Sequence, residues 1–464
     1  MRFMKFGKAL FLGALSVAIV CGVTSCIESY TVGYLYVTGT VTASTGSNGL
    51  ITGYQIDHNT GQLTPINALP VASGGANPVR AVLTLGSRFI YVLNRGANAA
   101  GSADCYGTDP STECLNANIT QFAVGGNGML TAEETFYTQG LNPFRMAVDG
   151  SGNYLMVLDH DAPDNANPSA GDACALALQN LGQGGSNVTT CGDVTIFSIN
   201  QTTGRLSLVQ NAQVTMNGKQ LTYFPVPANP VDFVLTGSSL LTLTGGATPA
   251  SFPYTGATSV WPYSYNGSNG QLTLSQNSVQ PLGIKQGTAI VYTNGVVYVL
   301  DNEPVTVDFN GTSTNSQSQI LPYTVGAAGA LQAEPTGVIP DDPTLGNPIQ
   351  LLVESKGHYL YVANQGNNTV GNNPESGLAG YYITTSPAYQ LTFLPHEPFG
   401  SGSGPQCIVE DPTDQYIYEA NEYDSTVTGR LLDPTSGYLD NMSRVQTYTL
   451  PGPASWCLID GRTN

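Results

Sequence analysis

The stretch that decides the fold runs from Gly404 to Leu439 and reads GPQCIVEDPTDQYIYEANEYDSTVTGRLLDPTSGYL. It contains an apolar run led by Pro405, a turn, a second run that ends at Asn421, a third run and a final Gly-Tyr-Leu turn. Short apolar runs of this length, separated by turn residues, are typical of β-strands. The whole phrase is the pattern expected for one four-stranded blade of a β-propeller.

The same phrase occurs seven times between Tyr34 and Asp460. Six copies begin, in chain order, at Asn77-Pro78, Asn142-Pro143, Asn229-Pro230, Gly287, Asn347-Pro348 and Gly404-Pro405. The seventh copy is divided between the two ends of the chain, because residues 34–63 lack an innermost strand and residues 452–460 supply one. We therefore predict an all-β fold, a seven-bladed β-propeller of residues 34–464 whose ring is closed by strands from both termini. Closing the ring in this way removes exposed sheet edges.

Residues 1–26 are predicted to be a lipoprotein signal peptide. A basic head and a short apolar run precede the sequence VTSC at residues 23–26, which resembles a bacterial lipobox. The apolar run is too short to span a bilayer. Residues 27–33 would then be a tether, and we expect a protein exported to the bacterial cell envelope and attached to the membrane only through a lipid on Cys26. An ordinary signal peptide cleaved near Ser25 is the alternative.

The cysteines indicate an oxidising compartment. Of the eight cysteines, Cys21 and Cys26 lie in the signal segment, and the other six fall either in inter-strand loops or on innermost strands. The repeat favours the pairs Cys105–Cys114, Cys174–Cys191 and Cys407–Cys457. A metal site is the alternative, but the chain has no CxxC pair and only four histidines. We therefore expect neither a metal nor a cofactor.

The chain is acidic, with a formal net charge of −18 at pH 7. A surface of this sign repels polyanions, so the composition argues against nucleic acid and anionic lipid headgroups as partners. An acidic surface that keeps an exported, Gly-rich protein soluble explains the same charge. We expect a monomer that binds a small acidic or sugar-like ligand.

Loop lengths predict which face of the propeller carries a site. Short connections such as residues 59–61 fall on one face. The long connections fall on the other face and comprise residues 95–117, 160–191, 213–228 and 336–346. Long loops on a rigid scaffold are where binding residues usually lie.

Two sets of residues are predicted to reach this long-loop face. The first set follows each leading Pro by two positions and comprises Arg80, Arg145, Asp232, Gln350 and Cys407. The second set lies at the ends of the second strands and comprises Asn94-Arg95, Asp159-His160-Asp161, Asp301-Asn302-Glu303, Asn364-Gln365 and Asn421-Glu422. Arginines opposite carboxylates suit a carboxylate or phosphate ligand with an acid or base beside it. Capping of strand ends and mutual pairing are the alternative roles of these polar residues.

The copy that begins at Gly404-Pro405 and includes Asn421-Glu422 resembles the seven-bladed lactonase family, which includes 6-phosphogluconolactonase and fungal carboxymuconate cyclase. The resemblance implies a propeller with a site that uses an Arg and a His after Gly-Pro and a later Glu. This chain keeps Glu422 but has Gln406 and Cys407 where the family has Arg and His. Arg80 and Arg145 could replace the charge, and His160 could replace the imidazole.

Three functions are consistent with the sequence. The first is a lactone hydrolase, in which Glu422, His160 or Asp159 activates water. Its substrate-binding residues would be Arg80, Arg145, Arg95, Asn94, Asn364 and Asn421. The second is a non-catalytic surface propeller that binds a carbohydrate or protein partner. The third is a propeller stabilised by calcium at an acidic loop formed by Asp159, Asp161, Asp164 and Asp172, although its spacing does not match an EF-hand loop.

The signal segment generates the first testable prediction. Cys26 should be the N-terminus of the mature protein and should carry acyl groups, because small residues directly before Cys are what lipoprotein processing requires. Mass spectrometry of the protein purified from its own membrane fraction checks this. A mature chain that starts at Ile27 or later, or one that retains Met1, would contradict it.

Overall fold

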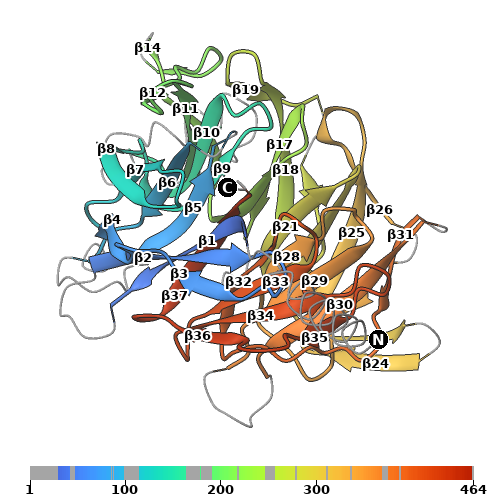
Figure 1. Cartoon of the computed structure of the whole chain (residues 1–464). Helices are drawn as coiled ribbons and strands as arrows, with labels where there is room; N and C mark the ends of the chain where they lie inside the picture. The colour runs from blue at the N-terminus through green and yellow to red at the C-terminus, as the bar shows by residue number, and fades with distance from the viewer. Residues whose placement is uncertain are drawn as a thin grey trace, which may run out of the picture.

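A computed structural model describes residues 30–41, 48–84, 86, 88–98, 114–163, 178, 191–216, 219–245, 257–276, 279–309, 312–334, 337–367, 375–385 and 388–461. In this part of the chain the fold is almost entirely β, and seven blades follow one another around a central channel (Figure 1). The predicted fold class is confirmed. Cys26, Cys105, Cys174, Asp164 and Asp172 lie outside the described residues.

Each blade is an antiparallel sheet whose strands follow one another outward from the channel. Blades 1 to 4 comprise β37 (Ala454–Asp460), β1 (Thr31–Thr40), β2 (Asn48–Asp57) and β3 (Leu63–Pro65); β5 (Pro78–Leu83), β6 (Phe89–Asn94), β7 (Asn118–Val124) and β8 (Leu130–Phe136); β9 (Leu141–Val148), β10 (Tyr154–Asp161), β11 (Cys191–Ile199) and β12 (Leu206–Leu208); and β16 (Pro230–Leu235), β17 (Ser239–Thr244), β18 (Ser259–Asn266) and β19 (Gln271–Leu274). Blades 5 to 7 comprise β21 (Gly287–Thr293), β22 (Val296–Asp301), β25 (Gln319–Val325) and β26 (Leu331–Ala333); β28 (Pro348–Val353), β29 (Tyr359–Asn364), β30 (Gly377–Thr385) and β31 (Ala388–Phe393); and β32 (Pro405–Glu410), β33 (Tyr416–Asn421), β34 (Thr426–Leu432) and β35 (Leu439–Asn441).

In several blades the outer edge of the third strand pairs with two strands. One is the fourth strand of the blade, and the other is a further short strand that follows it in the chain. These additional strands are β4 (Val71–Ala76), β15 (Tyr223–Pro227), β20 (Gln280–Pro281), β27 (Ile339–Pro340) and β36 (Thr447–Thr449). Two hairpins project from the blades, and they consist of β13 (Thr215–Met216) with β14 (Lys219–Gln220) and of β23 (Val305–Phe309) with β24 (Thr312–Ser316). A short 3₁₀ turn, η2 (Ala327–Gly329), precedes β26. Within the described residues, no helix is both long and apolar enough to cross a membrane.

The ring closes by pairing the two ends of the described chain. β1 lies between β2 and β37, so the blue N-terminal strand and the red C-terminal strand share one sheet (Figure 1). The predicted disulfide Cys407–Cys457 is present, and it joins the innermost strands β32 and β37 of neighbouring blades with a Cα–Cα distance of 5.8 Å. Because β1 begins at Thr31, residues 31–33 belong to the first strand and are not part of the tether expected at 27–33. Buried Val32 explains why the strand begins this early.

The Asn-Pro pairs of the repeat are explained by backbone conformation. Asn77, Asn142, Asn229 and Asn347 have φ values of 54°, 56°, 56° and 55°, which place them in the left-handed region that Asn tolerates better than most residues. The carbonyls of Asn77, Asn229 and Asn347 accept the N–H of the residue that follows the second strand of the same blade. This bond measures 2.9 Å from Arg95 to Asn77, and the equivalent bond is 2.7 Å from Glu422 to Gly404. In these blades the start of the innermost strand is therefore fixed against the end of the second strand.

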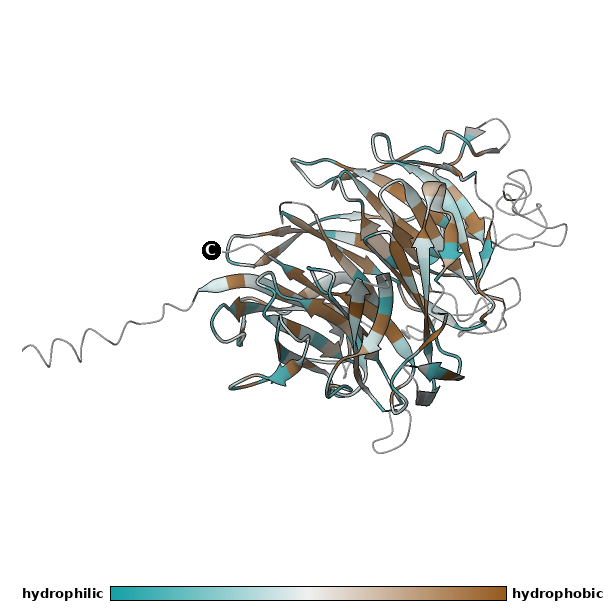
Figure 2. Ribbon diagram, turned by 90° about the vertical axis from the view of Figure 1, so that its right-hand side faces the viewer, coloured by the Kyte–Doolittle hydropathy of each residue, from teal (hydrophilic) through white to brown (hydrophobic). Residues whose placement is uncertain are grey.

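The hydrophobic core consists of layers between blades. Each of seven clusters of buried side chains combines residues from two neighbouring blades. Figure 2 shows the corresponding hydrophobic bands along the strands. The layer between blades 6 and 7, for example, contains Tyr361 and Ile408. Blade-to-blade packing is therefore the main source of stability, as expected for a repeat fold in which one blade cannot bury both of its faces alone.

Buried tyrosines connect neighbouring blades at the Gly-Xaa-Leu turns. The hydroxyls of Tyr36, Tyr361 and Tyr418 each donate to the carbonyl of the turn glycine in the next blade, at 2.7 Å in all three cases. Tyr91 makes the equivalent bond to Gly204. These turn glycines have positive φ and lie against an aromatic ring, so that a Cβ at Gly437 would overlap the ring of Tyr359.

This contact generates a stability prediction. Gly437→Ala adds left-handed backbone strain and overlap with Tyr359, so it should lower the free energy of unfolding by roughly 2 to 5 kcal/mol. Gly237→Ala is a matched control, because Gly237 also has positive φ but faces open space, and it should cost only about 1 to 2 kcal/mol. Urea unfolding of both variants measures the difference. Equal losses would show that the contact between blades contributes nothing at this turn.

Candidate functional site

A cavity of about 420 Å³ lies at the long-loop mouth of the central channel. Its charged and aromatic lining comes from the innermost strands and consists of Arg80, Arg145 and Trp456. Amide side chains form much of the remaining wall, and they are Asn302, Asn347, Gln365 and Gln406. Six separate blades contribute these seven residues, so the cavity exists only in the closed ring.

Arg80 is the most buried charged residue of this lining, with 9% of its surface exposed. Its guanidinium carbon lies 3.5 Å from the centroid of the Trp456 ring, which is a close cation–π contact. The indole Nε1 of Trp456 donates to the carbonyl of Ala81 at 3.1 Å and so holds the ring in place. Among the described residues, no carboxylate lies within ion-pair distance of Arg80. Burial, and then the charge of Arg145, lower the pKa of Arg80 well below its usual range.

Arg145 differs from Arg80 because it has a carboxylate partner. Its Nε lies 3.2 Å from Oδ1 of Asp232 in the next blade. Asp232 is itself held by main-chain donors, since its Oδ1 accepts the N–H of Phe233 at 2.9 Å and its Oδ2 accepts the N–H of Ile290 at 3.1 Å. The ion pair spans three blades through these bonds, and Asp232 offsets the charge of Arg145.

Glu422 lies behind the amide wall. Gln365 Nε2 donates to Glu422 Oε2 at 2.7 Å, and Gln406 Nε2 donates to the same oxygen. Asn347 Nδ2 in turn donates to Gln365 Oε1 at 2.6 Å. Three of these four side chains line the cavity, so a polar network connects the carboxylate of Glu422 to any ligand there. Gln406 occupies the position at which the family resemblance implied an Arg.

Asp159 occupies a different environment from the cavity. It faces Asp193 directly across β10 and β11, both residues are fully buried, and the Thr195 hydroxyl lies 3.3 and 3.1 Å from their carboxyl oxygens. Burial raises the pKa of Asp159 from 3.8 to about 8. Burial and the charge of Asp159 raise the pKa of Asp193 well above its usual range. One proton shared between the two carboxyls explains how the pair is accommodated, and it favours a structural role at this strand end.

His160 is held in place by an acidic neighbour. Its Nδ1 lies 2.9 Å from Oδ2 of Asp161, which also accepts Asn142 Nδ2 at 2.8 Å. His160 is not among the cavity-lining residues of the described chain. The imidazole that the sequence suggested as a replacement for the family His is therefore not part of the cavity wall.

The last residues of the second strands were expected to face the channel mouth, and three of them do not. Asn94, Asn364 and Asn421 are fully buried inside their blades. Asn94 Nδ2 donates to Asn118 Oδ1 at 2.9 Å, and Asn421 Nδ2 donates to Thr426 Oγ1 at 3.1 Å. The residues that reach the cavity lie one position later, as Asn302 and Gln365 do. Successive side chains on a strand point to opposite sides. This alternation in the sequence could have shown that neighbouring residues at a strand end face different surroundings.

The remaining predicted residues lie elsewhere. Arg95 follows β6 and is partly buried, and it is not among the described lining residues. Cys114 and Cys191 are disulfide-bonded, whereas their expected partners fall outside the described chain. Among the described residues, no group of three or more His, Cys, Asp or Glu side chains is arranged to hold a metal ion.

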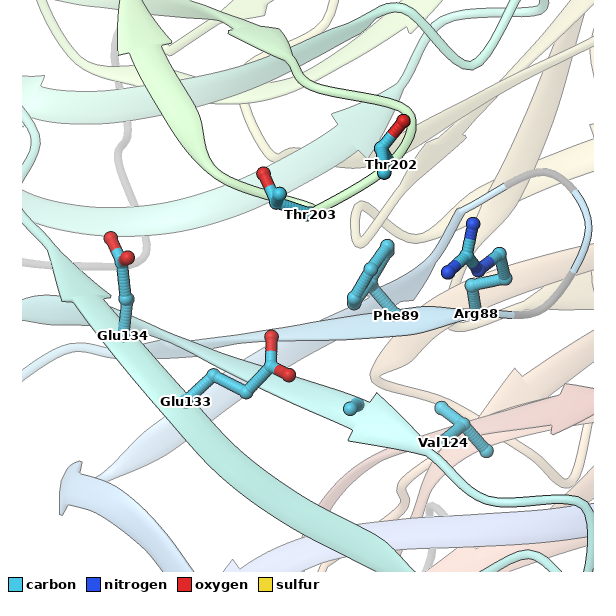
Figure 3. A pocket seen from close by; sticks show the side chains of 8 residues that line it. Arg88, Phe89, Val124, Glu133, Glu134, Thr202 and Thr203 are labelled. Atoms are coloured by element: carbon cyan, nitrogen blue, oxygen red, sulfur yellow. The ribbon is translucent and has the colours of Figure 1, made fainter.

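A second hollow of about 650 Å³ lies between blades 2 and 3, and Figure 3 shows its charged residues. Glu133 and Glu134 project from β8, with Arg88 at the other end and the turn residues Thr202 and Thr203 opposite. These carboxylates already have partners, because Gln121 donates to Glu133 and Arg205 lies 3.5 Å from Glu134. The channel mouth, where buried Arg80 has no ion-pair partner among the described residues, is therefore the better candidate site.

Comparison with known proteins agrees with this architecture. Residues 47–167 match the model of a family described as "Lactonase, 7-bladed beta-propeller". Similar solved structures include a candidate 6-phosphogluconolactonase from Bacteroides uniformis, with 13% identity, a TM-score of 0.60, and coverage of 92% of this chain and 99% of the other. A periplasmic gluconolactonase from Pseudomonas aeruginosa has 16% identity, a TM-score of 0.59, and coverage of 92% and 99%. No curated protein sequence matches the chain. The structural likeness, at these identities, concerns the fold, and the family resemblance seen in the sequence is confirmed.

The buried carboxyl pair generates a prediction about pH. The folded protein keeps a proton on Asp159 that the unfolded chain releases near pH 3.8, so this site should reduce the free energy of unfolding progressively as pH rises from about 4 to about 8. Asp159→Asn removes the titrating group and should flatten this decline by at least about 1.4 kcal/mol, the equivalent of one pKa unit. Urea unfolding at several pH values measures both slopes. Asp440→Asn, on the exposed edge strand β35, serves as the control, and parallel curves for all three proteins would contradict the assignment.

Proposed function

We propose that this lactonase-like seven-bladed propeller binds a sugar lactone, or the sugar acid formed from it, in the channel-mouth cavity and hydrolyses the lactone there. One observation carries the proposal. Arg80 is a buried guanidinium without an ion-pair partner among the described residues, and it borders a cavity walled by amides. A buried cation without a counter-ion reduces the stability of the folded protein, and a bound anion would relieve that cost. Such a group is therefore a functional-site candidate.

The remaining wall suits the hydroxyls of a sugar. Asn302, Asn347, Gln365 and Gln406 each carry both a hydrogen-bond donor and an acceptor, which matches the dual character of hydroxyl groups. The volume of about 420 Å³ lies within the range of small-molecule sites. The family match at residues 47–167 supports the lactone class.

The reaction requires a base and a group that stabilises negative charge. Glu422 would accept a proton from water as the water oxygen attacks the lactone carbonyl carbon. Arg80 would stabilise the resulting oxyanion, because a fixed cation in a site with little water interacts strongly with developing charge. The ring C–O bond then breaks, the ring oxygen takes the proton from Glu422, and a hydroxy acid is released. Water must reach a Glu422 oxygen past Gln365 and Gln406 for this step.

A second candidate, a non-catalytic propeller that binds a carbohydrate or protein partner, rests on the same amides. Gln365 and Gln406 both donate to Oε2 of Glu422, so this oxygen is already engaged. Cys407 is fully buried in a disulfide at the position where the family resemblance implied a His. Both features would preserve the binding site while weakening its base.

We also propose that the protein acts as a monomer at the bacterial cell envelope, attached through a lipid on Cys26. The disulfide Cys407–Cys457 supports an oxidising compartment. The acidic composition supports small ligands and argues against nucleic acid.

Glu422→Gln separates the two candidate functions. In a hydrolase this change removes the base with little change of shape, so turnover of glucono-δ-lactone should fall by roughly 100-fold or more while affinity changes little. Ring opening followed by proton release in weakly buffered solution measures turnover above the spontaneous rate. Glu134→Gln on β8 is the matched control, since its side chain is 48% exposed and lies outside the cavity.

The possible outcomes assign the function. Turnover that is unchanged in Glu422→Gln would exclude Glu422 as the base. A wild-type protein that binds gluconate but opens none of the lactones supplied would support the second candidate.

A further inference from the structure

The two cations that line the cavity differ in how close a carboxylate lies to each. Arg80 and Arg145 are the cations of the described lining, and Asp232 and Glu422 are the carboxylates in contact with that lining. Two positive and two negative side chains therefore lie in or directly behind the cavity wall. The two cations nevertheless have different environments.

Arg145 has little charge left to offer a ligand. Asp232 contacts its Nε at 3.2 Å and is fixed by the main-chain N–H groups of Phe233 and Ile290. Arg145 also donates from Nη1 to the carbonyl of Phe144 at 3.3 Å. Because both Asp232 oxygens are engaged by main-chain donors, the carboxylate cannot turn away when a ligand arrives.

Of the two cations in the described cavity lining, Arg80 is therefore the one that has no carboxylate within ion-pair distance. Its position on Trp456 keeps the guanidinium at the cavity wall. One such cation matches one negative charge, either a ligand carboxylate or the oxyanion that forms when a neutral lactone is attacked.

A phosphorylated sugar presents a different charge. A phosphate monoester carries about −1.5 to −2 at pH 7. In this cavity it would leave at least one negative charge desolvated without a partner, which is costly. The formal net charge of −18 on the whole chain adds long-range repulsion.

We infer that the site selects sugar lactones and sugar acids that lack a phosphate, and that Asp232 sets this selectivity by neutralising Arg145. The inference rests on the proposed function, because it specifies the ligand class of the same cavity. Asp232 acts through Arg145 and is therefore a specificity-determining residue that need not touch the ligand.

A matched pair of ligands tests the inference. Gluconate and 6-phosphogluconate differ only by the phosphate group, and calorimetry at fixed ionic strength gives both dissociation constants. Wild-type protein should bind gluconate at least 10-fold more tightly than 6-phosphogluconate. Asp232→Asn releases the charge of Arg145 and should reduce this preference at least 10-fold, mainly by improving the binding of 6-phosphogluconate. Asp232→Glu keeps the charge and should restore the preference.

The outcomes separate this inference from the proposed function. If wild-type protein binds neither acid, the proposed function is wrong and the inference fails with it. If it binds 6-phosphogluconate as tightly as gluconate, or if Asp232→Asn binds gluconate but keeps the wild-type preference, only the inference is wrong. The wild-type comparison requires no variant to fold.

Discussion

The hydrogen bond from the residue after the second strand to the residue before the innermost strand, which five blades of the described chain form, is the constraint on which the site depends. It is formed by Gln365 with Asn347 at 3.0 Å and by Glu422 with Gly404 at 2.7 Å. In these blades it places the first residues of the innermost strand beside the residue that follows the second strand. Because the blades surround one channel, these strand starts and strand ends converge on one channel mouth. The cavity is therefore assembled from residues far apart in the sequence, and buried tyrosines between blades keep the assembly rigid.

Equivalent positions at the channel mouth differ in their electrostatic environment. Arg80 and Arg145 occupy equivalent places in neighbouring blades, yet one is stacked on an indole and the other is paired with a carboxylate. Burying a cation without a counter-ion costs stability, and natural proteins retain such groups mainly where they act on a ligand. Asp159 and Asp193 are assigned a structural role instead, because neither lines the described cavity and burial raises the pKa of both groups, which favours a shared proton over a pair of charges.

The sequence predicted the features that follow from the repeat. The fold, the closure by β1 and β37, the disulfide Cys407–Cys457 and the placement of Arg80 and Arg145 at the mouth all depend on register within a blade, which the repeated phrase provides. It did not predict the non-covalent side-chain contacts between blades that shape the site. The partners Arg145 and Asp232 lie 87 residues apart, and Trp456 comes from the other end of the chain from Arg80. It also did not predict that Asn94, Asn364 and Asn421 are buried, whereas Gln365, the residue after Asn364, lines the cavity.

The central claim is that the channel mouth, organised around Arg80, is the ligand site. A crystal structure of the protein soaked with gluconate tests it most directly. The account predicts the sugar acid in the cavity, with its carboxylate hydrogen-bonded to the Arg80 guanidinium and its hydroxyls bonded to Gln365 and Gln406. Gluconate bound instead in the hollow beside Glu133 and Glu134, or bound at the mouth without contact to Arg80, would contradict it.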